Sequence, residues 1–258
     1  MFNSLKSTNN ILILIIFFFN STITLASYNQ SPSNSVYVIV HGAWGGGWSF
    51  KKIDQLLTEN GNTVYRPTLT GQGERVHLAS KEIDLKTHFN DIINTILFEE
   101  LYNIILVGHS YGGMVISGVA ERIPERIKKL IYVDAFVPED MESVSDFRES
   151  PWGSFNEMGY LVPSWVSMKK SPPKDVPHPG KTFTDEISLK NKKRASIPTT
   201  YILTVEKGIN KKSDYFFKHA ERAKQNGWSL KILSSDHNPQ WSIPEEFSEL
   251  LIKIKNEV

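Results

Sequence analysis

The ten residues ILVGHSYGGM (Ile105–Met114) restrict the fold more than any other part of the sequence. An apolar, β-branched run leads directly into Gly108, Ser110 and Gly112, so glycine stands two positions before the serine and two positions after it. An ordinary turn needs only one glycine. Two flanking glycines indicate that the chain bends sharply at Ser110 and that no side chain fits beside it.

The rest of the chain alternates between short apolar runs and segments with helical spacing. Strands that are apolar on both faces and alternate with helices form a parallel sheet covered on both sides. The sequence therefore predicts an α/β fold with a mostly parallel sheet of about six strands and helices on both faces. The predicted strands are Val36–Val40, Thr63–Pro67, Asn103–Gly108, Lys129–Asp134, Thr199–Val205 and Ser229–Ser234. The predicted helices cover about 48–60, 85–98, 110–122, 213–225 and 244–258.

A long segment, about residues 137–197, interrupts this alternation after the fourth predicted strand. Loops of this length are uncommon unless they are functional lids or binding loops. The segment leaves the carboxyl edge of the sheet, where ligands bind in open α/β folds. We therefore predict a cap inserted over a pocket.

Residues 1–26 have the three parts of a secretory signal peptide. Lys6 supplies the positive charge, Ile11–Phe19 is an unbroken apolar run, and small residues surround Ala26. Nine apolar residues are too few to span a bilayer core, which needs about 20. We expect a signal peptide over 1–26, an α/β domain over 27–258, and a secreted or periplasmic protein without stable membrane insertion after cleavage.

The composition excludes several kinds of site. The chain has no cysteine, which rules out disulfides, thiolate catalysis and cysteine-bound zinc. A net charge of +1 is far from the strongly positive charge that is typical of nucleic-acid-binding proteins. The glycine-rich loop HGAWGGGW (His41–Trp48) lacks the spacing of a dinucleotide-binding loop, and no G-K-[ST] follows it. We expect no cofactor, no metal and no nucleic acid.

Ser110 is the predicted nucleophile, because G-x-S-x-G between a strand and a helix is the context of a nucleophile elbow. The alternative is a glycine-rich turn with a helix-capping serine. A serine hydroxyl needs a base, which in turn needs an orienting acid. His237 follows the last predicted strand, at the same edge of the sheet as Ser110, and is the predicted base.

Two carboxylates compete for the role of the acid. Asp134 ends the fourth predicted strand, where a buried carboxylate requires a partner such as His237. Glu206 follows the fifth predicted strand, where this kind of fold most often carries its acid, but it is also consistent with an exposed loop residue. We predict Asp134 as the acid, with Glu206 as the alternative.

An oxyanion hole and a pocket complete the predicted site. One backbone donor is expected at Tyr111 and the other in the His41–Trp48 loop, at Ala43 or alternatively Trp44. The aromatic side chains Trp44, Trp48 and Trp165 are predicted to line an apolar substrate pocket.

Four segments resemble a known family: VHGAWGGGW, PTLTGQGER, VGHSYGGMV and LIYVDAFVPED. They are similar to the α/β-hydrolase fold superfamily, and more narrowly to bacterial esterase-type hydrolases related to plant methylesterases and hydroxynitrile lyases. The resemblance implies Ser110 as nucleophile, His237 as base, and Ala43 and Tyr111 as oxyanion donors. The methylesterase relatives carry an aspartate near Glu206 that this sequence lacks. One subgroup of haloalkane dehalogenases places its acid where Asp134 stands.

The same resemblance limits the chemistry. Hydroxynitrile lyases of this type have a threonine at the position of Gly42 and a lysine at the position of Asn238, and both are missing here. The expected reaction is therefore hydrolysis of small apolar or aromatic esters through an acyl-serine intermediate, with a small-molecule ester as partner. The same triad would also serve acyl transfer, lactone or thioester hydrolysis, or peracid formation. A ligand-binding protein on a hydrolase scaffold is the non-enzymatic alternative.

Overall fold

The structure is a computed structural model that describes residues 34–148 and 151–257. The predicted signal peptide, residues 1–26, lies outside the described residues. Among the described residues, no helix combines the length and the apolar character that crossing a membrane requires.

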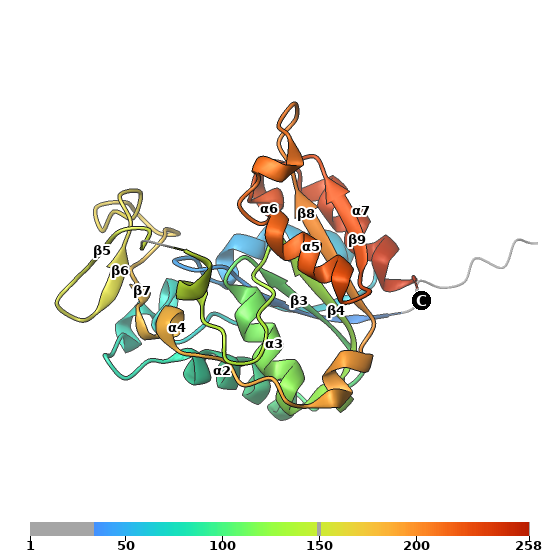
Figure 1. Cartoon of the computed structure of the whole chain (residues 1–258), viewed down its shortest axis with the longest axis horizontal. Coiled ribbons are helices and arrows are strands. Elements are labelled where there is room, and N and C mark those ends of the chain that lie inside the picture. The colour runs from blue at the N-terminus through green and yellow to red at the C-terminus, as the bar shows by residue number, and fades with distance from the viewer. Residues whose placement is uncertain (1–33, 149–150, 258) are drawn as a thin grey trace, which may run out of the picture. The chain divides into compact units, whose positions relative to one another are not determined.

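Six strands form one sheet in the order β2-β1-β3-β4-β8-β9 (Figure 1). Every neighbouring pair is parallel, which confirms the predicted sheet. The inner strands β3 and β8 are buried at every residue, as expected for strands that are covered on both faces. The strands are β1 (Val36–Val40), β2 (Thr63–Tyr65), β3 (Ile104–His109), β4 (Ile127–Val133), β8 (Thr199–Thr204) and β9 (Ser229–Leu233).

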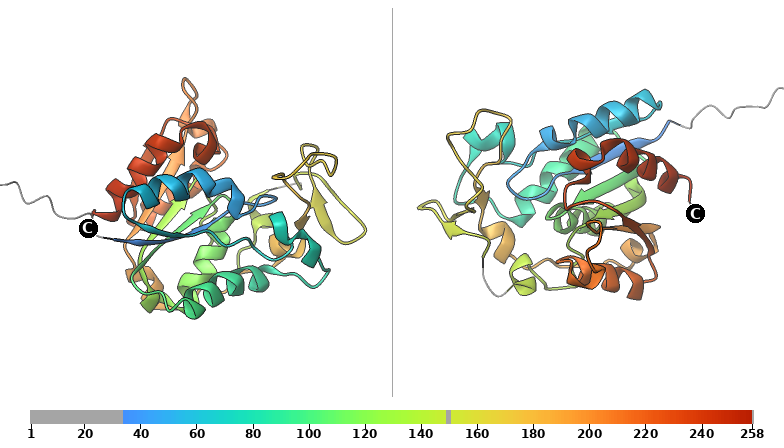
Figure 2. Two further views of the ribbon diagram at one scale, coloured as in Figure 1. Left: turned by 180° about the vertical axis from the view of Figure 1, so that it is seen from behind. Right: turned by 90° about the horizontal axis from the view of Figure 1, so that it is seen from above.

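Helices cover both faces of this sheet (Figures 1 and 2). On one face, α1 (Lys51–Glu59) and α7 (Pro244–Lys255) share an apolar core with alternate strand residues such as Ile105 and Val107. On the other face, the intervening strand residues pack against three helices. These are α2 (Leu85–Phe98), α3 (Gly112–Arg122) and α5 (Phe217–Gln225).

The chain leaves the sheet after β4 and returns to it at β8. In between, three short strands form an antiparallel sheet in the order β5-β6-β7, drawn in yellow and gold in Figure 1. They are β5 (Ser154–Phe155), β6 (Tyr160–Val162) and β7 (His178–Pro179), and they are followed by the short helix α4 (Lys181–Thr184). This is the segment that was predicted as a cap.

Several predicted helices begin later than expected, because short 3₁₀ turns precede them. Residues 47–50 form the 3₁₀ helix η1, and α1 follows at Lys51; η6 in the same way precedes α5. The helix after Ser110 begins at Gly112 because the serine itself belongs to the turn. The 3₁₀ helices are η1 (Gly47–Phe50), η2 (Gly73–Leu78), η3 (Pro124–Arg126), η4 (Val144–Phe147), η5 (Lys192–Ser196) and η6 (Lys211–Ser213). The short helix α6 covers Pro239–Ser242.

Candidate active site

Ser110 lies in a sharp turn between the end of β3 and the start of α3. Its φ of +54° is in the left-handed region, which is strained for a residue with a Cβ atom. Three backbone hydrogen bonds hold it there. Its N–H donates to Val133 O, and its carbonyl accepts from the N–H groups of Gly113 and Phe136, all at 3.1 Å. The turn therefore has the geometry of a nucleophile elbow.

The flanking glycines are required by close backbone approaches. A Cβ atom on Gly108 would lie 2.7 Å from the carbonyl oxygen of Gly112, and one on Gly112 would lie 2.6 Å from Val40 O. Both contacts are shorter than real Cβ atoms make, and the obstructing atoms belong to the backbone. The spacing of glycines around the serine thus follows from the steric crowding of the turn.

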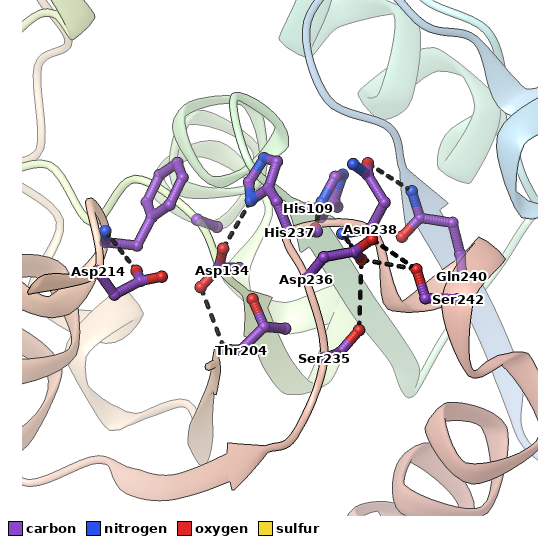
Figure 3. A network of polar contacts seen from close by, with 12 residues as sticks. His109, Asp134, Thr204, Asp214, Ser235, Asp236, His237, Asn238, Gln240 and Ser242 are labelled. Atoms are coloured by element: carbon purple, nitrogen blue, oxygen red, sulfur yellow. Dashed lines mark hydrogen bonds and ion pairs between the residues drawn. The ribbon is translucent and has the colours of Figure 1, made fainter. Parts of the chain in front are cut away.

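Asp134 is fully buried at the carboxyl end of β4, with a φ of +44°. Its Oδ2 lies 2.6 Å from Nδ1 of His237, and its Oδ1 accepts a hydrogen bond from the backbone N–H of Thr204 at 3.1 Å (Figure 3). A buried carboxylate needs such partners, because desolvation without them is costly. The ends of β4, β8 and β9 therefore meet at one carboxylate.

The other carboxylates near His237 make different contacts. Glu206 is exposed, and within residues 34–148 and 151–257 no hydrogen bond or ion pair joins its side chain to His237. Asp236 accepts hydrogen bonds from Asn238 N and from Ser242 Oγ (Figure 3). Asp134 is thus the carboxylate that the structure brings to the histidine.

Two residues that the sequence analysis did not single out fix the His237 ring and backbone. The phenyl ring of Phe216 is stacked on the imidazole, with ring centres 5.0 Å apart and planes within 2°. Nε2 of His109 donates to the carbonyl of His237 at 2.7 Å. Burial lowers the pKa of His109 to about 3, so this ring is neutral and its one N–H is used in that bond.

Ser110 and His237 line one cavity of about 310 Å³. Within the described residues no hydrogen bond joins Ser110 Oγ to the imidazole; such bonds often tighten only in the complex with substrate. The residues that line the cavity are Gly42, Ala43, Trp44, Gly45, Ser49, His109, Ser110, Trp165, Asp175, His237, Asn238, Gln240 and Trp241.

Two of the three predicted pocket tryptophans, Trp44 and Trp165, belong to this cavity. Trp48 does not line it, which corrects the prediction. The Trp48 indole is stacked on Trp241, with ring centres 5.7 Å apart and planes 16° apart. One face of the Trp48 indole is covered by the Trp241 indole. Trp241, from α6, lines the cavity.

The candidate oxyanion donors are backbone N–H groups in the loop after β1 and at the residue after Ser110. Within the described part of the chain, neither Ala43 N nor Tyr111 N has a hydrogen-bond partner. The N–H of Trp44 instead points at Nδ1 of His178, 3.3 Å away in β7. Of the two alternatives in the loop, Ala43 therefore carries the available N–H group.

Buried histidines brace the loops around the site. His41 Nδ1 donates to Gly42 O at 2.7 Å, while its Nε2 accepts from Leu69 N at 3.1 Å. His88 lies 2.9 Å from the hydroxyl of Tyr111, the residue after the predicted nucleophile. Burial lowers the pKa of both histidines to about 4, so both are neutral near pH 7. Across the described ranges, no group of three or more His, Asp or Glu side chains could hold a metal ion.

Comparison with known proteins places this architecture in a family. Residues 37–250 match the model of the alpha/beta hydrolase family. The chain belongs to that family, which confirms the fold predicted from the four sequence segments.

Three similar proteins illustrate the range of relatives. The carbendazim hydrolyzing esterase of Nocardioides sp. (strain SG-4G) is 51% identical over 108 residues, which span 42% of this chain and 45% of that protein. Methylesterase 1 of Arabidopsis thaliana is 23% identical over 84% of this chain and 95% of its own length. An extracellular α/β-hydrolase from a Paenibacillus species, described as sharing structural and functional homology with tobacco salicylic acid binding protein 2, superposes with a TM-score of 0.71. It is 22% identical over 87% of this chain and 100% of that one.

The match does not extend over the full length of every relative. The aligned region covers about half of the carbendazim hydrolyzing esterase and 56% of the putative chloroplastic methylesterase 15 of Arabidopsis thaliana.

We predict that Gly112→Ala destabilises the protein by about 1–3 kcal/mol, because its Cβ would collide with the Val40 carbonyl. Gly45→Ala is the matched control, since a Cβ there meets nothing closer than 3.8 Å. Urea unfolding followed by circular dichroism measures both. Equal unfolding midpoints for the two variants would contradict the steric account of the elbow.

We also predict that stability falls as the pH is lowered from about 6.5 to 5. Burial depresses the pKa of His41 and His88 to about 4, and that of His109 and His219 to about 3. An unfolded histidine titrates near 6.5, so the unfolded chain binds more protons in this window. Each such residue lowers the free energy of unfolding by up to about 1.4 kcal/mol per pH unit.

Thermal unfolding between pH 7.5 and 5 measures this dependence. His77→Gln is the control, because His77 is exposed and its replacement is expected to leave the slope unchanged. A melting temperature that stays constant from pH 7 to pH 5 would show that these histidines are not buried in the neutral form.

Proposed function

We propose that the protein is a serine carboxylesterase that cleaves small apolar or aromatic esters through an acyl-serine intermediate. One observation carries the proposal. Ser110 in a strained elbow, His237 and Ala43 line one cavity, and His237 is paired with buried Asp134 behind it. The backbone N–H groups of Ala43 and Tyr111 have no partner among the described residues. Acyl transfer by a serine requires this combination of nucleophile, base, acid and oxyanion donors.

In the first half of the reaction, Ser110 Oγ attacks the ester carbonyl while Nε2 of His237 accepts the hydroxyl proton. Asp134 holds the Nδ1–H of the ring and stabilises the imidazolium that forms. The side chain of Asp134 is 1% exposed, so water screens this interaction little. The N–H groups of Ala43 and Tyr111 donate to the oxyanion of the tetrahedral intermediate.

The alcohol then leaves with the proton from His237, and the acyl group stays on Ser110, which completes the first half. Water then enters and gives a proton to Nε2 of His237 as it attacks the acyl carbon. The acid is released when Ser110 Oγ recovers that proton. At the end of the cycle Ser110 and His237 are back in their starting protonation states, and the acyl group has left as the free acid.

The nature of the substrate is supported by the cavity walls and by the relatives. Trp44, Trp165 and Trp241 contribute large aromatic surfaces to the cavity lining. Several relatives are named methylesterase, and another is named carbendazim hydrolyzing esterase. A small-molecule ester is therefore the proposed partner. Export from the cytoplasm, to the periplasm or beyond, is proposed from the signal-peptide pattern of residues 1–26 alone.

Hydrolysis rates test the role of Ser110 as the nucleophile. Wild-type protein without residues 1–26 is expected to hydrolyse short p-nitrophenyl esters, and Ser110→Ala to lose at least about 10³-fold in kcat/KM, because no acyl-enzyme can form. Release of p-nitrophenol across acyl chains of two to eight carbons measures both the activity and the size of the pocket. Equal rates for the wild type and the variant would show that Ser110 is not the nucleophile.

Substitution of each carboxylate distinguishes the two candidate acids, Asp134 and Glu206. Asp134→Asn is expected to lower kcat by about 10²–10⁴-fold, since the ring of His237 loses its orienting charge. Glu206→Gln is the matched control, and a change of less than about twofold is expected because Glu206 is exposed. Circular dichroism checks that both variants are folded. The reverse ranking would assign the acid to Glu206.

A further inference from the structure

The cavity that contains Ser110 has one carboxylate among its described lining residues, Asp175. This residue lies in the segment between β4 and β8, and the mechanism above does not use it. Within residues 34–148 and 151–257, no hydrogen bond or ion pair joins the Asp175 side chain to another group. Its place on the cavity wall therefore leaves the carboxylate open to a ligand.

Aromatic surfaces surround the same space. Trp44 and Trp165 meet edge to face, with ring centres 5.3 Å apart and planes at 82°, so they form two walls of a corner. Trp165 and Trp241 are 45% and 50% exposed, so large parts of both indoles are not covered by protein. All three line the cavity. Indole faces attract cations through the negative potential above the ring.

The position of Asp175 is fixed relative to the oxyanion loop. The N–H of its neighbour Val176 donates to the carbonyl of Trp44 at 2.9 Å. The indole Nε1 of Trp44 donates to Leu161 O at 3.2 Å, which ties the same loop to β6. The backbone beside Asp175 is thus tied to the loop that carries Ala43.

The electrostatic surroundings favour a positive ligand at this wall. Partial burial raises the pKa of Asp175, and the field of Lys170 opposes that rise without an ion pair. Gln240 also lines the cavity, and its Oε1 is buried without a hydrogen-bond donor in the described part of the chain. The other titratable groups on the cavity wall are His109, whose pKa is lowered to about 3, and His237. A partly desolvated carboxylate gains from a cation placed against it.

We infer that the substrate is an ester with a positively charged nitrogen group, held between the carboxylate of Asp175 and the indole faces of Trp165 and Trp241. This inference rests on the proposed esterase function and revises its substrate class, because a positively charged nitrogen group takes the place of a purely apolar substituent. The charged group occupies the part of the cavity lined by these three residues, while the ester carbonyl lies at the N–H groups of Ala43 and Tyr111.

A pair of isosteric thioesters tests this directly. Acetylthiocholine carries a trimethylammonium group, and S-(3,3-dimethylbutyl) thioacetate carries a neutral tert-butyl group of the same shape. The released thiol is followed with a thiol-reactive dye, which the protein does not consume because it has no cysteine. For wild type at pH 8, kcat/KM for the cationic ester is expected to exceed that for the neutral ester at least about tenfold.

In Asp175→Asn this ratio of kcat/KM values is expected to fall towards one. Glu157→Gln is the matched control, because it removes the same charge from an exposed site in the same segment, outside the cavity wall. Its ratio is expected to equal that of the wild type. A wild-type ratio of one or less, or a ratio that Asp175→Asn leaves unchanged, overturns the inference.

The outcome also separates this inference from the proposed function. Hydrolysis of both thioesters without a cationic preference refutes the cation site and leaves the esterase intact. If neither thioester is hydrolysed, binding of choline and of 3,3-dimethylbutanol, followed by tryptophan fluorescence, decides the inference. Tighter binding of choline that is lost in Asp175→Asn supports the site, and equal binding of the two alcohols refutes it.

Discussion

The buried carboxylate of Asp134 is the group on which the arrangement of this site depends. A charge with a side chain 1% exposed is tolerated only where donors are already in place, and here they are Thr204 N and His237 Nδ1. Thr204 is the last residue of β8, and His237 follows β9. The ends of β4, β8 and β9 must therefore align before the carboxylate is satisfied, so the parallel sheet and the site are specified together.

The second organising contact is between the segment after β4 and the loop after β1. Trp44 has a φ of +65°, and its backbone is held by Val176 N and by His178, while its indole N–H is bound to Leu161 O. The N–H of Trp44 is engaged by His178, whereas the N–H of the neighbouring Ala43 has no partner among the described residues. The segment thus lines part of the cavity and also holds the loop after β1 in place.

Much of this could be predicted from the sequence, because the signals were local. Buried β-branched runs predicted the six strands, and paired glycines predicted the turn at Ser110. Asp134 was preferred over Glu206 because it ends a buried strand, and the structure brings Asp134 to His237. Trp48 was misplaced because its ring is stacked on Trp241, 193 residues away. Asp175 and His178 were missed because they lie in an irregular segment without periodicity, where only long-range contacts fix their positions.

The proposed function depends on one step, in which Ser110 forms a covalent acyl intermediate with the help of the Asp134–His237 pair. Rapid acid quenching of the protein during turnover of a p-nitrophenyl ester, followed by intact and peptide mass spectrometry, tests it most directly. We expect one acyl group to be added to the wild-type protein, on the peptide that contains Ser110, and no such adduct in Ser110→Ala. Turnover of the ester with no adduct, or with an adduct on another residue, would contradict it.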